Sequence, residues 1–279
     1  MNAFETIIYE KRDGIAYITL NRPQALNAVN IKMRDELYEV LPALDDDPEV
    51  MVGIIKGAGN RGFSAGADIT EFGTTPSQAI ARQVRWERDL WGQFLGVSKP
   101  LIAAIHGFAL GAGVEMSMCC DIRIASDDAR FGLPEVGIGM VPTAGGSQTM
   151  PRLVWPGTCT APIFTGEIIN AAEALRIGLI HRIVTRADLI PAAEGMAKVI
   201  MSRGQLAVRY AKEAINRGLD LALEQGLEME SELFAMVLNT GDAREIMKCK
   251  MQSEQEDDEI ASSFLRRTRN DIMSGVMAK

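Results

Sequence analysis

Residues 99–115 read K-P-L-I-A-A-I-H-G-F-A-L-G-A-G-V-E. The apolar run at 101–105 is typical of a short strand that is buried on both faces of a parallel sheet. Small residues follow it and lead into an apolar stretch that holds Glu115. A strand, a tight turn and a helix in this order indicate an α/β fold with a carboxylate near the start of a helix.

Alternating elements continue upstream of this segment. Glu5–Lys11 and Ile15–Leu20 are predicted strands joined by an Arg-Asp-Gly turn. The apolar residues that then recur at helical spacing are Met33, Leu37, Val40, Leu41 and Leu44. The D-D-D-P segment ends this predicted helix before a strand at Val50–Ile55.

Downstream, the pattern changes from α/β to mostly α. We expect one long amphipathic helix at Ser77–Leu95, strands at Ile122–Ala125 and His181–Val184, and a helix capped by Asn170. Three more helices are predicted near 187–201, 205–217 and 220–239. We therefore expect a core with the site at residues 1–195 and a helical region at 196–279.

Composition narrows the possible functions. The chain of 279 residues has a net charge of −8 and a hydrophobic fraction of 47%. An acidic protein is poorly suited to general binding of nucleic acid or anionic membranes. No uncharged run approaches the roughly 20 residues that span a bilayer, and the first ten residues resemble no targeting peptide. Four cysteines without a C-x-x-C pair and two histidines predict neither zinc nor disulfides. We expect a cytoplasmic protein.

A second carboxylate lies in a similar setting. Residues 131–146 read F-G-L-P-E-V-G-I-G-M-V-P-T-A-G-G, with Glu135 between Pro134 and Val136. An ionised side chain in an apolar stretch is costly unless it has a partner or a task. Each glutamate alone is equally well explained as a helix-end or turn residue. Together the two suit general acid/base chemistry, provided that the fold brings them close.

Two alanines follow glycines at points where the chain is predicted to enter a helix. Ala67 lies in S-A-G-A-D, and Ala112 lies in L-G-A-G-V. The first N–H groups of a helix have no internal acceptor, so two of them could hold one oxyanion. The G-x-G-x-x-G match at 57–62 is no dinucleotide site on this reading, because no long helix and no acid at the required distance follow it.

Five ordered blocks give the chain a specific resemblance. They lie at 21–27 (N-R-P-Q-A-L-N), 63–69 (F-S-A-G-A-D-I), 99–115, 131–148 and 165–180. Together they resemble the enoyl-CoA hydratase/isomerase, or crotonase, family. The resemblance implies an α/β fold built as a spiral of ββα units, with a C-terminal helical region that trimerises, often into a dimer of trimers.

The resemblance also implies a chemistry. The substrate would be an acyl-CoA thioester, whose oxygen is held by the N–H groups of Ala67 and Ala112. Glu115 and Glu135 would flank the reacting carbons, and members with both acids are typically hydratases, which are lyases of fatty acid metabolism. The product would be a 3-hydroxyacyl-CoA, and neither a metal nor a cofactor beyond the coenzyme A of the substrate is expected. The implied substrate-binding positions are Gln24, Ala25, Leu26, Ala65, Asp68, Ile69, Gly111, Gly137 and Gly145.

The chain departs from the family pattern at its C-terminus, where the usual contacts to the CoA phosphates are missing. A solvated or frayed tail is the favoured interpretation of this segment, although its basic residues could substitute for those contacts: Lys248, Lys250, Arg266 and Arg267. A double-bond isomerase or a specialised hydroxyacyl-CoA dehydratase remains an alternative, as does a non-catalytic acyl-CoA- or RNA-binding homologue. The arginines that could serve RNA, Arg82, Arg85 and Arg88, are also typical of a solvated helix face. Acyl-chain preference is not predicted.

Overall fold

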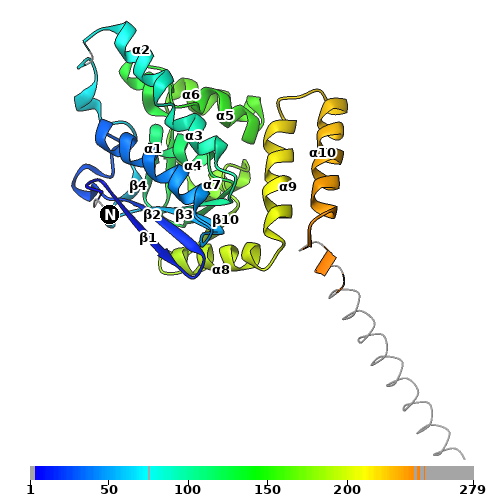
Figure 1. Ribbon diagram of the computed structural model, residues 1–279. Coiled ribbons are helices and arrows are strands. Elements are labelled where there is room, and N and C mark those ends of the chain that lie inside the picture. Colours follow the sequence, from blue (N-terminus) through cyan, green and yellow to red (C-terminus); the bar gives the residue numbers. More distant parts are fainter. Residues whose placement is uncertain (1–3, 75, 242–243, 246–247, 249–279) are drawn as a thin grey trace, which may run out of the picture. The chain divides into compact units, whose positions relative to one another are not determined.

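The computed structural model describes residues 4–74, 76–241, 244–245 and 248 (Figure 1). The chain divides into two compact units, Met1–Gln205 and Leu206–Lys279. The predicted boundary at residue 195 falls within helix α8 (Leu189–Met201).

The first unit is built on a six-stranded sheet with the order β1-β2-β3-β5-β7-β10. Its strands are β1 (Ile7–Arg12), β2 (Ile15–Leu20), β3 (Val52–Gly57), β5 (Leu101–Ile105), β7 (Ile122–Ser126) and β10 (Arg182–Val184). The predicted hairpin is confirmed, because β1 and β2 are antiparallel and Asp13 and Gly14 between them have φ of 51° and 77°. All other pairs in this sheet are parallel, as expected.

A second, four-stranded sheet has the order β4-β6-β8-β9. Its strands are β4 (Gly62–Ser64), β6 (Phe108–Leu110), β8 (Arg130–Gly132) and β9 (Ile169–Asn170). Each of β3, β5 and β7 is followed along the chain by a short strand of this second sheet and then by helical segments. The expected repetition of ββα units is therefore confirmed. The G-x-G-x-x-G match at 57–62 spans the connection from β3 to β4, so it is followed by a strand and starts no helix.

Helices and 3-10 turns connect the strands of this unit. The α-helices are α1 (Ile31–Asp46), α2 (Gln78–Glu87), α3 (Leu90–Gly96), α4 (Ala112–Met118), α5 (Gly146–Leu153), α6 (Pro156–Thr165), α7 (Ala171–Arg176) and α8. The 3-10 helices are η1 (Pro23–Ala25), η2 (Ile69–Glu71) and η3 (Pro134–Ile138). The predicted cap of α7 is confirmed, because Oδ1 of Asn170 accepts the N–H of Glu173 at 2.9 Å.

The single helix predicted at Ser77–Leu95 is wrong. The structure has α2 and α3 in its place, separated at Arg88 and Asp89. Oδ1 of Asp89 accepts the N–H of Gly92 at 3.1 Å, so this side chain starts a new helix. Although Asp89 lies inside an amphipathic pattern, it ends the pattern as one helix and starts α3 as a separate helix.

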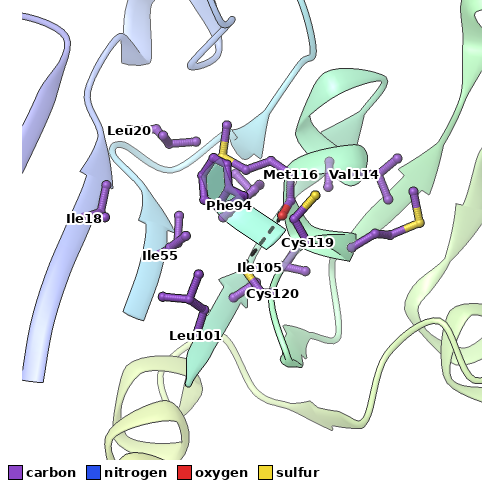
Figure 2. Packing of buried hydrophobic residues seen from close by; sticks show 14 of the residues in the cluster. Ile18, Leu20, Ile55, Phe94, Leu101, Ile105, Val114, Met116, Cys119 and Cys120 are labelled. Atoms are coloured by element: carbon purple, nitrogen blue, oxygen red, sulfur yellow. Dashed lines mark hydrogen bonds between the residues drawn. The ribbon is translucent and has the colours of Figure 1, made fainter. Parts of the chain in front are cut away.

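The two faces of the large sheet carry different layers. Helix α8 covers one face, where Leu189, Ala193 and Ala197 pack on strand residues such as Ile54 and Ile102. Helices α1, α3 and α4 belong to the larger cluster on the other side (Figure 1). Figure 2 shows part of that cluster, in which Ile18, Ile55 and Leu101 of neighbouring strands gather with Phe94 and Met116. The core thus fixes α4, the helix that carries Glu115.

The second unit contains α9 (Gln205–Gly218), which starts at the last residue of the first unit, and α10 (Leu223–Leu238). The predicted helices near 205–217 and 220–239 are confirmed. Lys248 is exposed, whereas Lys250, Arg266 and Arg267 lie outside the described residues. Within the described part of the chain, every helix is too short or too polar to cross a bilayer.

Candidate functional site

A cavity of about 590 Å³ lies in the first unit. Its wall is formed by the start of α1, the segment from Ala65 through η2, the first turn of α4, Trp91 of α3, and the segment from η3 to Ala144. These pieces belong to different ββα units, so the cavity exists only in the folded chain. Both glutamates and both alanines that the sequence singled out are among its lining residues.

Ala67 presents its N–H at the cavity wall because of the way its neighbours pair. The N–H of Val29 donates to the carbonyl of Gly66 at 2.8 Å, and the N–H of Asp68 donates to the carbonyl of Val29 at 3.0 Å. These bonds use the carbonyl of Gly66 and the N–H of Asp68, which flank Ala67. The N–H of Ala67 itself therefore points away from Val29. Among the described residues, no acceptor receives this N–H.

Ala112 offers a second N–H of the same kind. It is the first residue of α4, and the hydrogen bond from Glu115 N–H to Gly111 carbonyl, 3.0 Å, begins the helix. An N–H at this position has no acceptor inside its helix, and no described residue outside the helix accepts it. A Cβ placed on Gly66 would lie 3.4 Å from the nitrogen of Ala112. The two segments that carry the N–H groups are therefore in close contact.

Glu115 is the more deeply buried of the two carboxylates, with 2% of its surface exposed. Its Oε1 accepts the N–H of Ala144 at 3.0 Å and the N–H of Gly146 at 2.7 Å. Two amide donors on one oxygen hold that oxygen as an acceptor and fix the orientation of the carboxyl group. The loop before α5 therefore positions this side chain in the cavity wall.

Gly146 leaves the space that this arrangement needs. A Cβ at Gly146 would lie 2.8 Å from Oε1 and 3.0 Å from Cγ of Glu115. We expect Gly146→Ala to displace the carboxylate and to lower kcat for the reaction of this site by about 10²-fold, since misplacement by an ångström has effects of that size. Gly157→Ala is the matched control, because a Cβ there meets nothing within 4 Å. Equal activity of the two variants would contradict this role of Glu115.

Glu135 is held differently. It lies in η3 and is half-buried, and a Cβ on Gly111 would lie 2.7 Å from its Oε1. Its Oε2 is buried and has no hydrogen-bond partner among the described residues. Burial raises the pKa of the Glu135 carboxyl above its ordinary value, although its own backbone N–H acts in the opposite direction. Burial thus favours the protonated form of Glu135.

This raised pKa makes a prediction about stability. Below the pKa of the unfolded chain, about 4.3, both folded and unfolded Glu135 hold the proton and no penalty arises. As the pH rises through the higher pKa of the folded state, a buried carboxyl must ionise and the free energy of unfolding falls. We expect Glu135→Gln to be more stable than the wild type at pH 8, with the difference vanishing near pH 4. Urea unfolding at several pH values measures it, and a constant difference would contradict it.

The structure divides the remaining predicted binding residues into two groups. Ala65, Asp68, Ile69 and Gly111 line the cavity. The predicted residues outside its wall are Gln24, Ala25, Leu26, Gly137 and Gly145. Their role in binding substrate stays a prediction.

Asp68 has a structural partner. Its Oδ2 accepts Nη1 of Arg22 at 2.9 Å, and its Oδ1 accepts the N–H and the hydroxyl of Thr70 at 3.2 and 2.7 Å. The same guanidinium nitrogen donates to the carbonyl of Ala28 at 2.7 Å. Arg22 and Asp68 therefore tie the Ala67 segment to the chain before α1, and these contacts hold the pKa of Asp68 below its ordinary value.

Several lining residues were missed by sequence reasoning. They include Arg34, Phe72, Trp91, Met140 and Val141. Arg34 lies off the apolar stripe of α1, and the other four look like ordinary core or loop residues in the sequence. These residues come together only because α1, α3 and the loops pack around the same cavity.

His106 and Arg88 do not line this cavity. His106 directly follows β5, and burial together with the nearby charge of Arg186 lowers its pKa to about 4. Arg88 pairs with Asp35 at 3.0 Å and with Glu39 at 3.4 Å. One of the three arginines that could serve RNA is thus engaged by acids of α1.

Comparison with known proteins gives concordant results. The model of the enoyl-CoA hydratase/isomerase family matches residues 10–257. A crotonyl-CoA hydratase of Syntrophomonas wolfei is 40% identical over 245 residues, which is 88% of this chain and 94% of that protein. A short-chain-enoyl-CoA hydratase of Clostridium acetobutylicum is 42% identical over 86% of this chain and 92% of its own. The crystal structure of an enoyl-CoA hydratase from Bacillus anthracis superposes with a TM-score of 0.85 and 34% identity, and covers 89% of this chain and 97% of its own.

Proposed function

The chain belongs to the enoyl-CoA hydratase/isomerase family, and we propose that its cavity hydrates 2-enoyl-CoA thioesters to 3-hydroxyacyl-CoA. The observation that carries this proposal is the joint placement of two carboxylates and two unpaired N–H groups in one wall. Hydration needs an acid, a base and a site for negative charge on the thioester oxygen, and these four groups can supply all three.

The thioester oxygen would accept the N–H groups of Ala67 and Ala112. As water attacks C3 of the enoyl group, electrons move through C2 and the carbonyl, and the oxygen gains negative charge. Donors that are already aimed at this position stabilise the charge without having to reorganise. Their placement by a β-bridge and by the start of a helix makes them rigid.

The environments of the glutamates favour different roles for the two. Glu115, whose Oε1 accepts two backbone N–H groups, would take the proton of the attacking water. Glu135, whose pKa burial raises, would donate its proton to C2. One C–O bond and one C–H bond form, the C2–C3 π bond is lost, and the proton on Glu115 must return to Glu135 before the next turnover. Nothing is oxidised or reduced, so the sequence calls for no redox cofactor, and the two N–H groups would stabilise the thioester oxygen in place of a metal ion.

A direct assay tests the proposal. Hydration of crotonyl-CoA removes the absorbance of the conjugated thioester, and mass spectrometry with NMR shows whether one water has been added at C3. We expect turnover that persists after dialysis against EDTA. If the protein binds CoA esters without turnover, or moves the double bond without adding water, the proposal is wrong.

We also infer that copies of the chain associate, as a homotrimer or a hexamer. Large apolar side chains of the first unit are exposed outside the cavity lining, among them Trp155 (80%) and Phe164 (74%). Exposed apolar side chains of this size favour coverage by another protein surface. Light scattering after gel filtration measures the mass, and a monomer at micromolar concentration would contradict the inference. Cys119, Cys120 and Cys159 are buried and form no disulfide among the described residues, which suits the cytoplasm as the place of action; fractionation of cells would test this.

A further inference from the structure

Arg34 is the only basic side chain among the described residues that line the cavity. Its backbone continues α1, and its N–H donates to the carbonyl of Asn30 at 3.0 Å. The guanidinium makes no hydrogen bond or ion pair with any described residue. A cation in the wall of a binding cavity without a protein partner is available to a ligand.

The acids near Arg34 have other partners. Oε2 of Glu71, a second lining residue, accepts the N–H of Ile31 at 2.8 Å. Asp35, the next residue of α1, pairs with Arg88 at 3.0 Å. Asp68 pairs with Arg22 at 2.9 Å. The charge of Arg34 is therefore not neutralised by a contact within the described protein.

The position of Arg34 indicates which part of a thioester it can reach. Val29 pairs with Ala67, Asn30 caps α1, and Arg34 follows Asn30 by four residues, a rise of about 6 Å along the helix. The phosphates of coenzyme A are separated from the thioester by an arm as long as about four extended residues, roughly 14 Å. Because Arg34 lines the same cavity as Ala67 and follows its bridge partner Val29 closely along the chain, we expect its guanidinium to reach a group a few bonds from the reacting carbons.

The surroundings of Arg34 favour the acyl group as that part. Ile31, Phe72 and Trp91 line the same cavity and would contact a short carbon chain. We propose that Arg34 selects 2-enoyl-CoA substrates whose acyl chain ends in a carboxylate, which its guanidinium would bind through paired N–H···O bonds. This inference rests on the proposed hydratase function and names the substrate class of the same site.

The test compares two substrates of equal chain length. Pent-2-enedioyl-CoA carries a terminal carboxylate, and pent-2-enoyl-CoA carries a methyl group in its place. We expect the wild type to have a higher kcat/KM for the dioyl ester. Arg34→Gln should lower the ratio of the two kcat/KM values about 10- to 100-fold, the range for a lost hydrogen bond to a charged group. Arg34→Lys should retain part of the preference, because it keeps the charge but not the paired geometry.

Arg203→Gln is the matched control, since Arg203 is exposed just after α8, away from the cavity lining. Its ratio should equal that of the wild type. If Arg34→Gln leaves the ratio unchanged, or lowers kcat/KM equally for both esters, Arg34 does not recognise the acyl end and the inference is wrong.

A binding measurement separates this inference from the hydratase proposal. Calorimetry with the saturated pair, glutaryl-CoA and pentanoyl-CoA, needs no turnover. Suppose that neither enoyl ester is hydrated, but that the wild type binds glutaryl-CoA more tightly than pentanoyl-CoA and Arg34→Gln does not. The proposed reaction is then wrong, whereas the inference on Arg34 is supported. Equal binding of both esters by the wild type would overturn the inference even if hydration is observed.

Discussion

Replacing Glu135 by glutamine is expected to lower kcat for enoyl-CoA hydration by about 10³-fold, within the usual 10²- to 10⁴-fold contribution of a general acid. Glutamine preserves the shape of the side chain but has no proton to give to C2. KM should change much less, because the thioester is held by main-chain donors. The measurement is the initial rate of absorbance loss with crotonyl-CoA at saturation.

Three further variants make the Glu135 result decisive. Glu115→Gln should cause a loss of similar size, and the double variant should be little worse than either single one, because the two groups act in one step. Glu10→Gln, at an exposed position on β1, is the matched control and should keep full activity. Because Glu135→Gln is also expected to be the more stable protein at pH 8, unfolding could not explain its lost activity. Wild-type rates in this variant would refute the acid role.

The second large effect concerns the N–H of Ala112. Ala112→Pro should lower kcat/KM about 10²- to 10³-fold, the cost of removing one donor of an oxyanion site. Proline is tolerated at the first position of a helix, where its missing N–H breaks no internal bond. The fold should therefore survive the change, and circular dichroism and thermal unfolding would verify this.

The control for the proline variant keeps the donor and removes the methyl group. Ala112→Gly retains the N–H at the same backbone position, and we expect its kcat/KM to stay within a few-fold of the wild type. If the proline variant is folded and fully active, the N–H of Ala112 does not stabilise the oxyanion. If the glycine variant is as inactive as the proline variant, the loss must be ascribed to the shape of the turn.

Much of the core could be predicted from periodicity because burial imposes it. Leu101–Ile105 is apolar throughout, and in the structure both faces of this strand are covered. The stripe from Met33 to Leu44 is apolar at helical spacing, and all five of its residues are buried. Such patterns record an environment that repeats along the chain, so local reasoning recovers them.

The cavity could be predicted only in part, for a physical reason. Glu115 and Glu135 stood out because charge in an apolar stretch is costly, and glycines marked the turns beside them. Arg34 and Trp91 carry no such local signal, since a charged helix position and a core aromatic are ordinary. The break at Asp89 was missed because periodicity does not register a capping side chain. The full set of residues that line the cavity cannot be predicted from local patterns, because it depends on contacts between segments that are distant in the sequence.

The unequal anchoring of the two carboxylates has a consequence for how proteins of this shape can diversify. Oε1 of Glu115 accepts the N–H groups of Ala144 and Gly146, so losing that side chain would disturb the loop before α5. Oε2 of Glu135 has no hydrogen-bond partner in the described part of the chain, so we expect its substitution to disturb the fold less. We therefore expect new catalytic activities on this scaffold to arise by substitution at position 135, where a change costs little stability. Substitution at position 115 would also remove contacts that hold the fold together.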